Sequence, residues 1–427
     1  MSPVPASAEG PAPPEVPGST ADLRVWQVVF IAVIAIVFTV AYLSLYAQLN
    51  KTIWGEDSLL VVTPWAIPAA VVFFSLLVGL SRKYLHAPDV IHEGFADSLK
   101  GGEGGKPDHR TFPGALLSSL FSLLSGASIG PEGTITLLLM YVSSFVRKRL
   151  RIESPSAALG FDVAALASAF NGVIGSVLFT GVFATEFQVG GNKNALRLLT
   201  WNLLAGTIGF GFYLLIGFPS FARSIPFEPM GEFLPVYILY AVALGIAGSL
   251  LAVFAGVSMQ AAEKILDRVF GGAVVTRVLA AGVVVAAVGY AIPELLFSGG
   301  AQIHGIITDP ARFGAVMLLG MAIAKILLLA LSFKSGYIGG PLFPIIFSST
   351  LVGLALSLVF PGIPVAILVL CIEAAALTFA LGAPLTSILL VVVVGTADQN
   401  MIVLLTLSAV TAMLIAARVK ERMGERA

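Results

Sequence analysis

The sequence contains little charge, one cysteine and few histidines. Charged residues make up 11% of the 427 residues, and positive and negative charges are equal in number. A soluble domain carries roughly 25% charged residues. The single cysteine, Cys371, excludes an internal disulfide. The four histidines include no pair at metal-ligand spacing in a helix, so we expect no metal site and no cofactor. The neutral charge balance argues against nucleic acid as a partner.

Apolar residues are abundant instead, at 57% of the chain. This composition predicts a polytopic membrane protein that is surrounded by the lipid bilayer. Residues 1–22 are rich in Pro, Ala, Ser and Glu and have no cationic start before an apolar stretch. We therefore expect a disordered N-terminal tail rather than a signal peptide. Two transmembrane regions, 23–217 and 218–417, and a short tail, 418–427, complete the predicted organisation.

The pattern Ser-Gly-x-x-x-Gly-Pro occurs twice, at Ser125–Pro131 and Ser335–Pro341. An Ala-rich segment follows each copy, beginning at Ala169 and Ala380, and the offsets between the two halves are 210 and 211 residues. Several apolar segments are shorter than the ~20 residues that a membrane-spanning helix needs. Short segments interrupted by Gly and Pro at matching positions of two halves are typical of transporters. The sequence thus predicts an all-α fold of two inverted-topology repeats with short, broken, tilted helices.

The first copy of the pattern predicts a helix start that can bind an anion. Pro131 stands in the first helical turn, where a proline loses no hydrogen bond, and the flanking glycines permit close approach of a ligand. The second copy offers the backbone amides that follow Pro341. Two helix starts directed at one point would hold an anion through free amides and the helix dipoles. The candidate anion-binding residues are Gly130, Glu132, Gly133, Thr134, Gly340, Leu342 and Phe343.

Glu132 is the most informative single residue. A carboxylate at a membrane-buried helix start is costly unless its charge is satisfied, and is by default a functional candidate. When ionised, Glu132 would compete with an external anion for the same amides, and when protonated or displaced it would release them. The sequence therefore predicts a gating glutamate. The alternative is a glutamate that caps a helix at the surface.

Several motifs carry a resemblance to a known family. Gly130–Thr134 looks like a Gly-Arg-Glu-Gly-Pro gate motif, and Gly340–Pro344 looks like a Gly-x-Phe-x-Pro motif. Ala169–Gly172 and Ala383–Thr386 match the downstream helices, and Lys325 matches a basic position. In the order and spacing of these motifs the chain resembles the CLC family of chloride channels and anion/proton exchangers.

The resemblance covers about residues 25–417. It implies voltage-gated or proton-coupled anion transport, with Glu132 as the gate, by a homodimer with one pore in each subunit. We expect a multi-pass protein of the plasma membrane, the inner membrane of a bacterial cell. The positive-inside rule places two basic clusters in the cytoplasm, Arg147–Arg151 and Arg418–Arg426. We expect both termini of the chain to be cytoplasmic.

The chain departs from the family pattern around the expected central anion. The segment His86–Gly94 has no serine where the family has an anion-binding one, and no helix with the family's anion-binding tyrosine follows Ala417. Pro341 occupies a position whose amide helps to hold the anion in relatives, and proline has no N–H. We therefore expect weaker or differently selective anion binding.

Exchangers of the family carry a second glutamate that passes the proton. An ungapped count from Asn171 places it at Phe183, which cannot titrate. Glu186, about one helical turn further on, and Glu373, an acid in apolar surroundings, are the candidates for a proton path. A residue at the end of a helix is the alternative interpretation of Glu186.

Chloride is the expected substrate, and fluoride/proton exchange is the alternative. A gate motif that ends in Gly-Thr, here Gly133-Thr134, is common in the fluoride branch of the family, which also lacks the central serine and the intracellular glutamate. A membrane-embedded enzyme is a remote alternative. His92-Glu93 lacks the second histidine of a His-Glu-x-x-His site, and Ser125 does not stand in a Gly-x-Ser-x-Gly turn. We therefore expect a transporter and not an enzyme.

Overall fold

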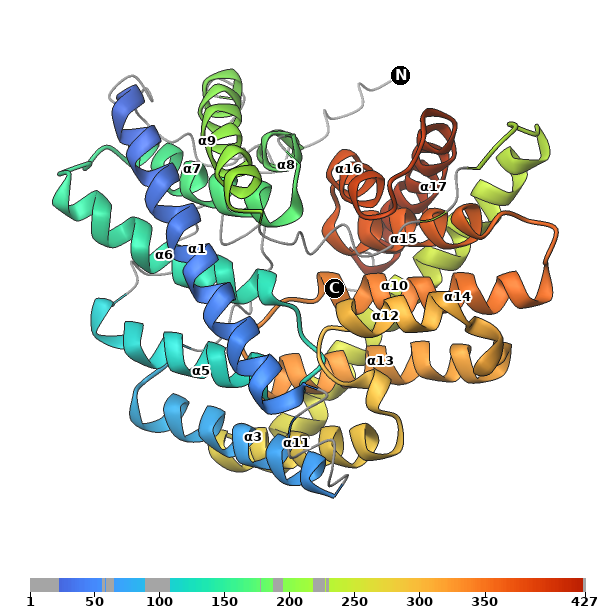
Figure 1. The fold of residues 1–427 in the computed structure, drawn as a ribbon, viewed down its shortest axis with the longest axis horizontal. Helices are drawn as coiled ribbons and strands as arrows, with labels where there is room; N and C mark the ends of the chain where they lie inside the picture. Colours follow the sequence, from blue (N-terminus) through green and yellow to red (C-terminus); the bar gives the residue numbers. More distant parts are fainter. Residues whose placement is uncertain are drawn as a thin grey trace, which may run out of the picture.

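The computed structural model describes residues 23–55, 58, 65–88, 108–176, 178–186, 195–217, 227 and 230–424. Helices are the only regular elements in this part of the chain, and one isolated antiparallel bridge joins Gly130 to Gly340 (Figure 1). The expected tail 1–22 lies outside the described residues, as do residues 89–94 of the segment without the serine. The fold is thus all-α, as predicted.

Nine helices in the described ranges are long and apolar enough to cross a membrane. They are α1 (Val25–Trp54), α3 (Ala66–Tyr84), α7 (Pro155–Ile174), α9 (Ala195–Ile216), α10 (Val236–Phe270), α11 (Val274–Ala291), α13 (Ala315–Ser335), α14 (Leu342–Val359) and α17 (Gln399–Gly424). The last of these continues through most of the expected tail 418–427.

The remaining elements are shorter or carry more charge. They are α5 (Phe112–Leu124), α6 (Pro131–Arg149), α8 (Phe179–Glu186), α12 (Gly300–Thr308), α15 (Val365–Leu381), α16 (Pro384–Val394) and the single turns η2 (His109–Thr111), η4 (Pro293–Leu295) and η5 (Pro310–Arg312). Helices α15 and α16 fall below the ~20 residues of a full span. The short, broken helices that the sequence predicts are therefore present in the fold.

Corresponding helices of the two repeats end at glycines in the left-handed conformation. Gly126 (φ 76°) follows α5 and Gly336 (φ 112°) follows α13, each just before a loop with the repeated motif. Gly175 (φ 75°) ends α7 and Gly382 (φ 69°) ends α15, before the short helices α8 and α16. A residue with a Cβ is strained at such a φ, whereas glycine is not. The series α5–α9 and α13–α17 therefore repeat the same order of elements. Helices α6–α9 lie on the opposite side of the molecule from α14–α17 (Figure 1).

The core lies where helices cross at short range. In lipid, helix association depends on close packing of small residues because lipid tails are as apolar as leucine. Gly248 of α10 illustrates this, since a Cβ there would lie 2.4 Å from the carbonyl oxygen of Ile372. Helix α15 is buried at every position from Ala366 to Thr378. In contrast, α10 exposes large apolar side chains such as Leu250, which is 63% exposed, as expected of a lipid-facing helix.

Candidate functional site

The structure brings the two predicted helix starts together. The amide of Gly130 donates to the carbonyl of Gly340 at 2.7 Å, and the amide of Gly340 donates back to the carbonyl of Gly130 at 2.8 Å. The hydroxyl of Thr134 donates to the carbonyl of Ile338 at 3.1 Å. A Cβ on Gly133 would lie 2.2 Å from the carbonyl oxygen of Gly339, so only glycine permits this approach. The two loops therefore form one junction between the repeats.

Glu132 lies inside this junction and is only 6% exposed. Its Oε1 accepts a hydrogen bond of 2.7 Å from the amide of Leu342, the first residue of α14. Its other oxygen, Oε2, is buried without a hydrogen-bond partner among the described residues. A carboxylate from the first repeat thus occupies the positively polarised start of a helix in the second repeat, where an anion is stabilised.

The glycines around Glu132 make room for its carboxylate. A Cβ on Gly130 would lie 1.9 Å from Oε2, and one on Gly340 would lie 2.3 Å from Oε1. Because the amides of both glycines are engaged in the bridge, their contribution in this state is space rather than donors. Of the seven candidates, Leu342 contacts the carboxylate directly, Gly130 and Gly340 enclose it, and Gly133 and Thr134 hold the loops together.

Two serines that the sequence analysis did not single out support the junction. Ser122 of α5 accepts a hydrogen bond of 3.0 Å from the amide of Ile338 in the second loop. Ser332 of α13 accepts one of 3.3 Å from the amide of Ser128 in the first loop. Both serines stand at the same position of the repeat, and this equivalence is the sequence signal that would have identified them.

Lys325 is fully buried on α13. Among the described residues it makes no hydrogen bond to the carboxylate of Glu132. Its Nζ donates to the carbonyls of Leu295 and Leu296 at 3.0 and 3.4 Å and to the carbonyl of Phe297. It also lies 4.8 Å from the ring centroid of Phe347 on α14. These contacts attach the end of η4 and the two residues that follow it to α13 and α14.

Glu186, at the end of α8, caps a helix of the other repeat. Its carboxylate accepts hydrogen bonds from the amides of Leu385 and Thr386 at 2.6 and 2.7 Å, and from the Thr386 hydroxyl at 2.6 Å. These donors belong to the first turn of α16, and the contact therefore satisfies a helix N-terminus. The side chain of Phe183 lies outside the described residues.

Glu373 lies apart from the junction, fully buried on α15. One of its oxygens is 2.6 Å from the hydroxyl of Thr350 on α14, and the other has no partner among the described residues. Across all the residues that the structure describes, no group of three or more His, Cys, Asp or Glu side chains could hold a metal ion.

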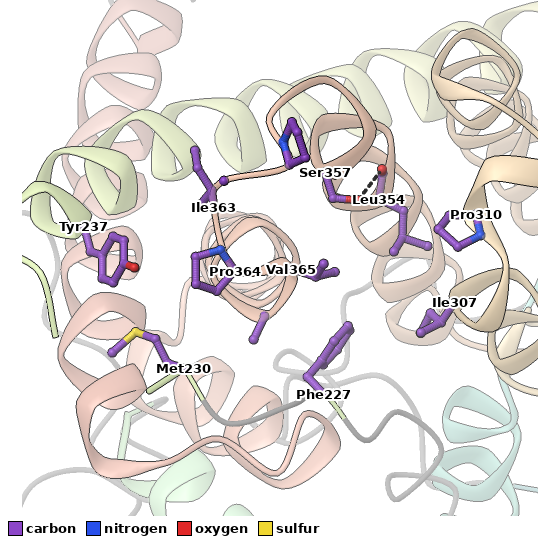
Figure 2. A pocket seen from close by; sticks show the side chains of 13 residues that line it. Phe227, Met230, Tyr237, Ile307, Pro310, Leu354, Ser357, Ile363, Pro364 and Val365 are labelled. Carbon is purple, nitrogen blue, oxygen red and sulfur yellow. Dashed lines mark hydrogen bonds between the residues drawn. The ribbon is translucent and has the colours of Figure 1, made fainter. Parts of the chain in front are cut away.

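Two cavities flank these elements. One, of about 670 Å³, is lined mainly by apolar side chains at the start of α15 and includes no residue of the junction (Figure 2). The other, of about 320 Å³, lies at the end of α13, where the second loop begins. There Arg82 donates to the carbonyl of Gly336 at 2.8 Å, and Lys334 pairs with Glu263 at 2.9 Å. Basic and acidic side chains thus together line a cavity next to the second loop.

Comparisons with known proteins show what the chain is similar to. The family model described as voltage gated chloride channel matches residues 74–417. A putative chloride channel protein ClcB-like from Ralstonia nicotianae is 27% identical over an alignment of 344 residues, and the match covers 74% of each chain. The structure of a slow cyanobacterial Cl⁻/H⁺ antiporter superposes with a TM-score of 0.78 at 18% identity, covering 92% of this chain and 94% of that one. A CLC-type fluoride/proton antiporter gives a TM-score of 0.71 at 18% identity and the same coverage.

Proposed function

The chain belongs to the voltage-gated chloride channel (CLC) family, and from this premise we propose that it carries chloride through a pore gated by Glu132. Transport of anions follows from the family. The choice of substrate and the gate are the proposal. The observation that carries it is the 2.7 Å hydrogen bond from the Leu342 amide to the buried Glu132 carboxylate. A helix start that stabilises a carboxylate can stabilise a small inorganic anion by the same dipole and amides.

The gate works by competition for one binding position at the start of α14, beside the Leu342 amide. This position is the anion seat. Ionised Glu132 occupies the start of α14 and excludes an external anion. A proton on Glu132 removes its charge and weakens its hydrogen bond from the Leu342 amide, since bonds to charged groups are roughly twice as strong. An anion can then take the seat. The space for the carboxylate exists because Gly130 and Gly340 have no side chains, since a Cβ on either would lie within 2.3 Å of a carboxylate oxygen.

Proton coupling belongs to this proposal as well. Two of the similar solved structures are antiporters, one of chloride with protons and one of fluoride with protons. A gate that opens when it binds a proton would supply the proton-binding step of an exchange of anions for protons. Fluoride is the alternative substrate, because Gly133-Thr134 matches the motif ending of the fluoride branch. The homodimer and the cytoplasmic position of both termini stay predictions.

The test is anion efflux from liposomes that contain the purified protein. Efflux of chloride and of fluoride is followed with ion-selective electrodes, and a pH indicator reports proton movement. We expect Glu132→Gln to transport anions at a rate that no longer depends on pH and without proton movement. Glu421→Gln, an exposed glutamate on α17, serves as the control and should behave as wild type. A Glu132→Gln variant with unchanged rate, pH response and selectivity would refute the gate.

A further inference from the structure

Glu373 stands in surroundings that do not stabilise a negative charge. Helices α10, α14, α16 and α17 pack against α15. Helices α14 and α16 have no charged residue, and Glu373 is the only one on α15. The charged residues of α10 and α17 are confined to their last turns, at 263–268 and 418–422, and the one other titratable group on α15 is the Cys371 thiol. Since an isolated buried carboxylate is very costly, a neutral acid is favoured here.

The hydroxyl of Thr350 has one hydrogen and two acceptor oxygens within hydrogen-bond distance. Its Oγ1 lies 2.9 Å from the carbonyl oxygen of Ile346, one turn earlier on α14, and 2.6 Å from Oε1 of Glu373. A hydroxyl has a single hydrogen and can donate to only one of these oxygens. Threonine in a helix can donate to the carbonyl four residues earlier, here that of Ile346. An ionised Glu373 accepts the single Thr350 hydrogen and leaves the Ile346 contact without one, whereas a protonated Glu373 that donates to Thr350 allows both contacts to be hydrogen bonds.

A cavity lies one to two helical turns from this pair along both helices. The cavity of about 670 Å³ is lined on α14 by Leu354 and Ser357, one and two turns beyond Thr350 on the same face. On α15 it is lined by Ala366, two turns before Glu373 on the same face. Along the helix axes the pair lies about 6 Å from Leu354 and about 10 Å from Ala366. Figure 2 looks along α15 from its start, with Leu354 and Ser357 of α14 at its side.

We propose that Glu373 is a proton-binding site of the transport cycle, reached by protons through this cavity. The part that concerns transport rests on the proposed function. Helix α14 links the two acids, because Leu342 at its start contacts Glu132 and Thr350 contacts Glu373. Leu342 and Thr350 are about 12 Å apart along the helix axis. A change of protonation at Glu373 therefore acts on the same helix that forms the anion seat.

Infrared spectroscopy tests the proton directly. We expect a carboxylic acid C=O band in the wild-type protein that is absent in Glu373→Gln and shifted in Thr350→Val, which removes the hydroxyl at nearly constant shape. Transfer to D₂O should shift the band, and Ser357→Trp, which fills the cavity, should slow that shift. Glu421→Gln is the control and should keep the band. A wild-type spectrum without a band that depends on Glu373 would overturn the proposal.

Liposome flux tests the role in transport. We expect Glu373→Gln to keep anion efflux and to lose proton movement, with Thr350→Val impaired in the same direction. A proton-to-anion ratio in Glu373→Gln equal to that of wild type would overturn the proposal, as would a wild-type protein that moves anions without protons. A wild-type protein that moves no anions at all would instead refute the proposed function, while the infrared band still reports whether Glu373 holds its proton.

Discussion

Ser122 and Ser332 make equivalent hydrogen bonds on opposite sides of the junction between the two loops. Ser122, on a helix of the first repeat, accepts from the amide of Ile338 at 3.0 Å. Ser332, on a helix of the second repeat, accepts from the amide of Ser128 at 3.3 Å. Each loop is thus held by the helix that precedes the other loop. The anion seat consequently forms only when both repeats have folded against each other.

This relationship predicts that Ser122→Ala and Ser332→Ala destabilise the protein to a similar degree. Each variant leaves a buried backbone amide without its acceptor, which costs about 1–3 kcal/mol. Thermal unfolding in detergent measures the loss. Ser118→Ala is the matched control, because the Ser118 hydroxyl is buried on the same helix without a hydrogen-bond partner. Equal stability of Ser332→Ala and Ser118→Ala would contradict the supporting role.

Gly340→Ala should expel the Glu132 carboxylate from the seat. The new Cβ would lie 2.3 Å from Oε1 of Glu132, and the φ of Gly340 is not in the positive region, so the effect is steric rather than conformational. We expect anion efflux that no longer responds to pH, as in Glu132→Gln. Gly256→Ala on α10 is the control, since no atom lies within 4 Å of its new Cβ. Efflux from Gly340→Ala with wild-type pH dependence would contradict this assignment.

Glu186→Gln should lower stability and leave the proton-to-anion ratio unchanged. A glutamine has one acceptor oxygen in place of two, and the variant therefore loses at least one charge-assisted bond to the start of α16. A bond of this type is worth about 1.5–3 kcal/mol. Thermal unfolding and paired flux measurements separate the two effects. A changed ratio with normal stability would instead identify Glu186 as part of the proton path.

Lys325→Met should destabilise the protein through the carbonyls that it leaves behind. The ammonium group donates to Leu295 and Leu296 as well as to the next carbonyl, and each buried acceptor left unpaired costs about 1–3 kcal/mol. We expect a lower unfolding temperature than for Lys264→Met, an exposed lysine on α10. If the two variants unfold at the same temperature, other donors satisfy these carbonyls.

Much of the fold could be predicted from local sequence patterns. Pro131 does open α6, and the glycines of both repeated motifs do stand at the helix ends, because proline and glycine act through backbone constraints that need no partner. The end of α17 was less predictable. Its last turns are polar, and they continue the helix to Gly424 where a tail was expected.

The roles of the buried polar groups could not be predicted in the same way. Glu186 and Glu373 were both candidates for a proton path in the sequence, with a residue at a helix end as the alternative for Glu186. In the structure, the carboxylate of Glu186 is satisfied by backbone amides of α16, whereas Glu373 meets a single hydroxyl. This difference depends on which helix lies opposite each acid, and no pattern within either segment carries that information.

The sequence by itself determined that this is an all-helical membrane protein with a duplicated motif and an acid at a helix start, because composition, periodicity and backbone preferences are local properties. Only the tertiary structure decided that Glu132 of one repeat meets Leu342 of the other, 210 residues away. Hydrogen bonds between distant segments depend on how the two repeats pack, and packing is a property of the whole chain.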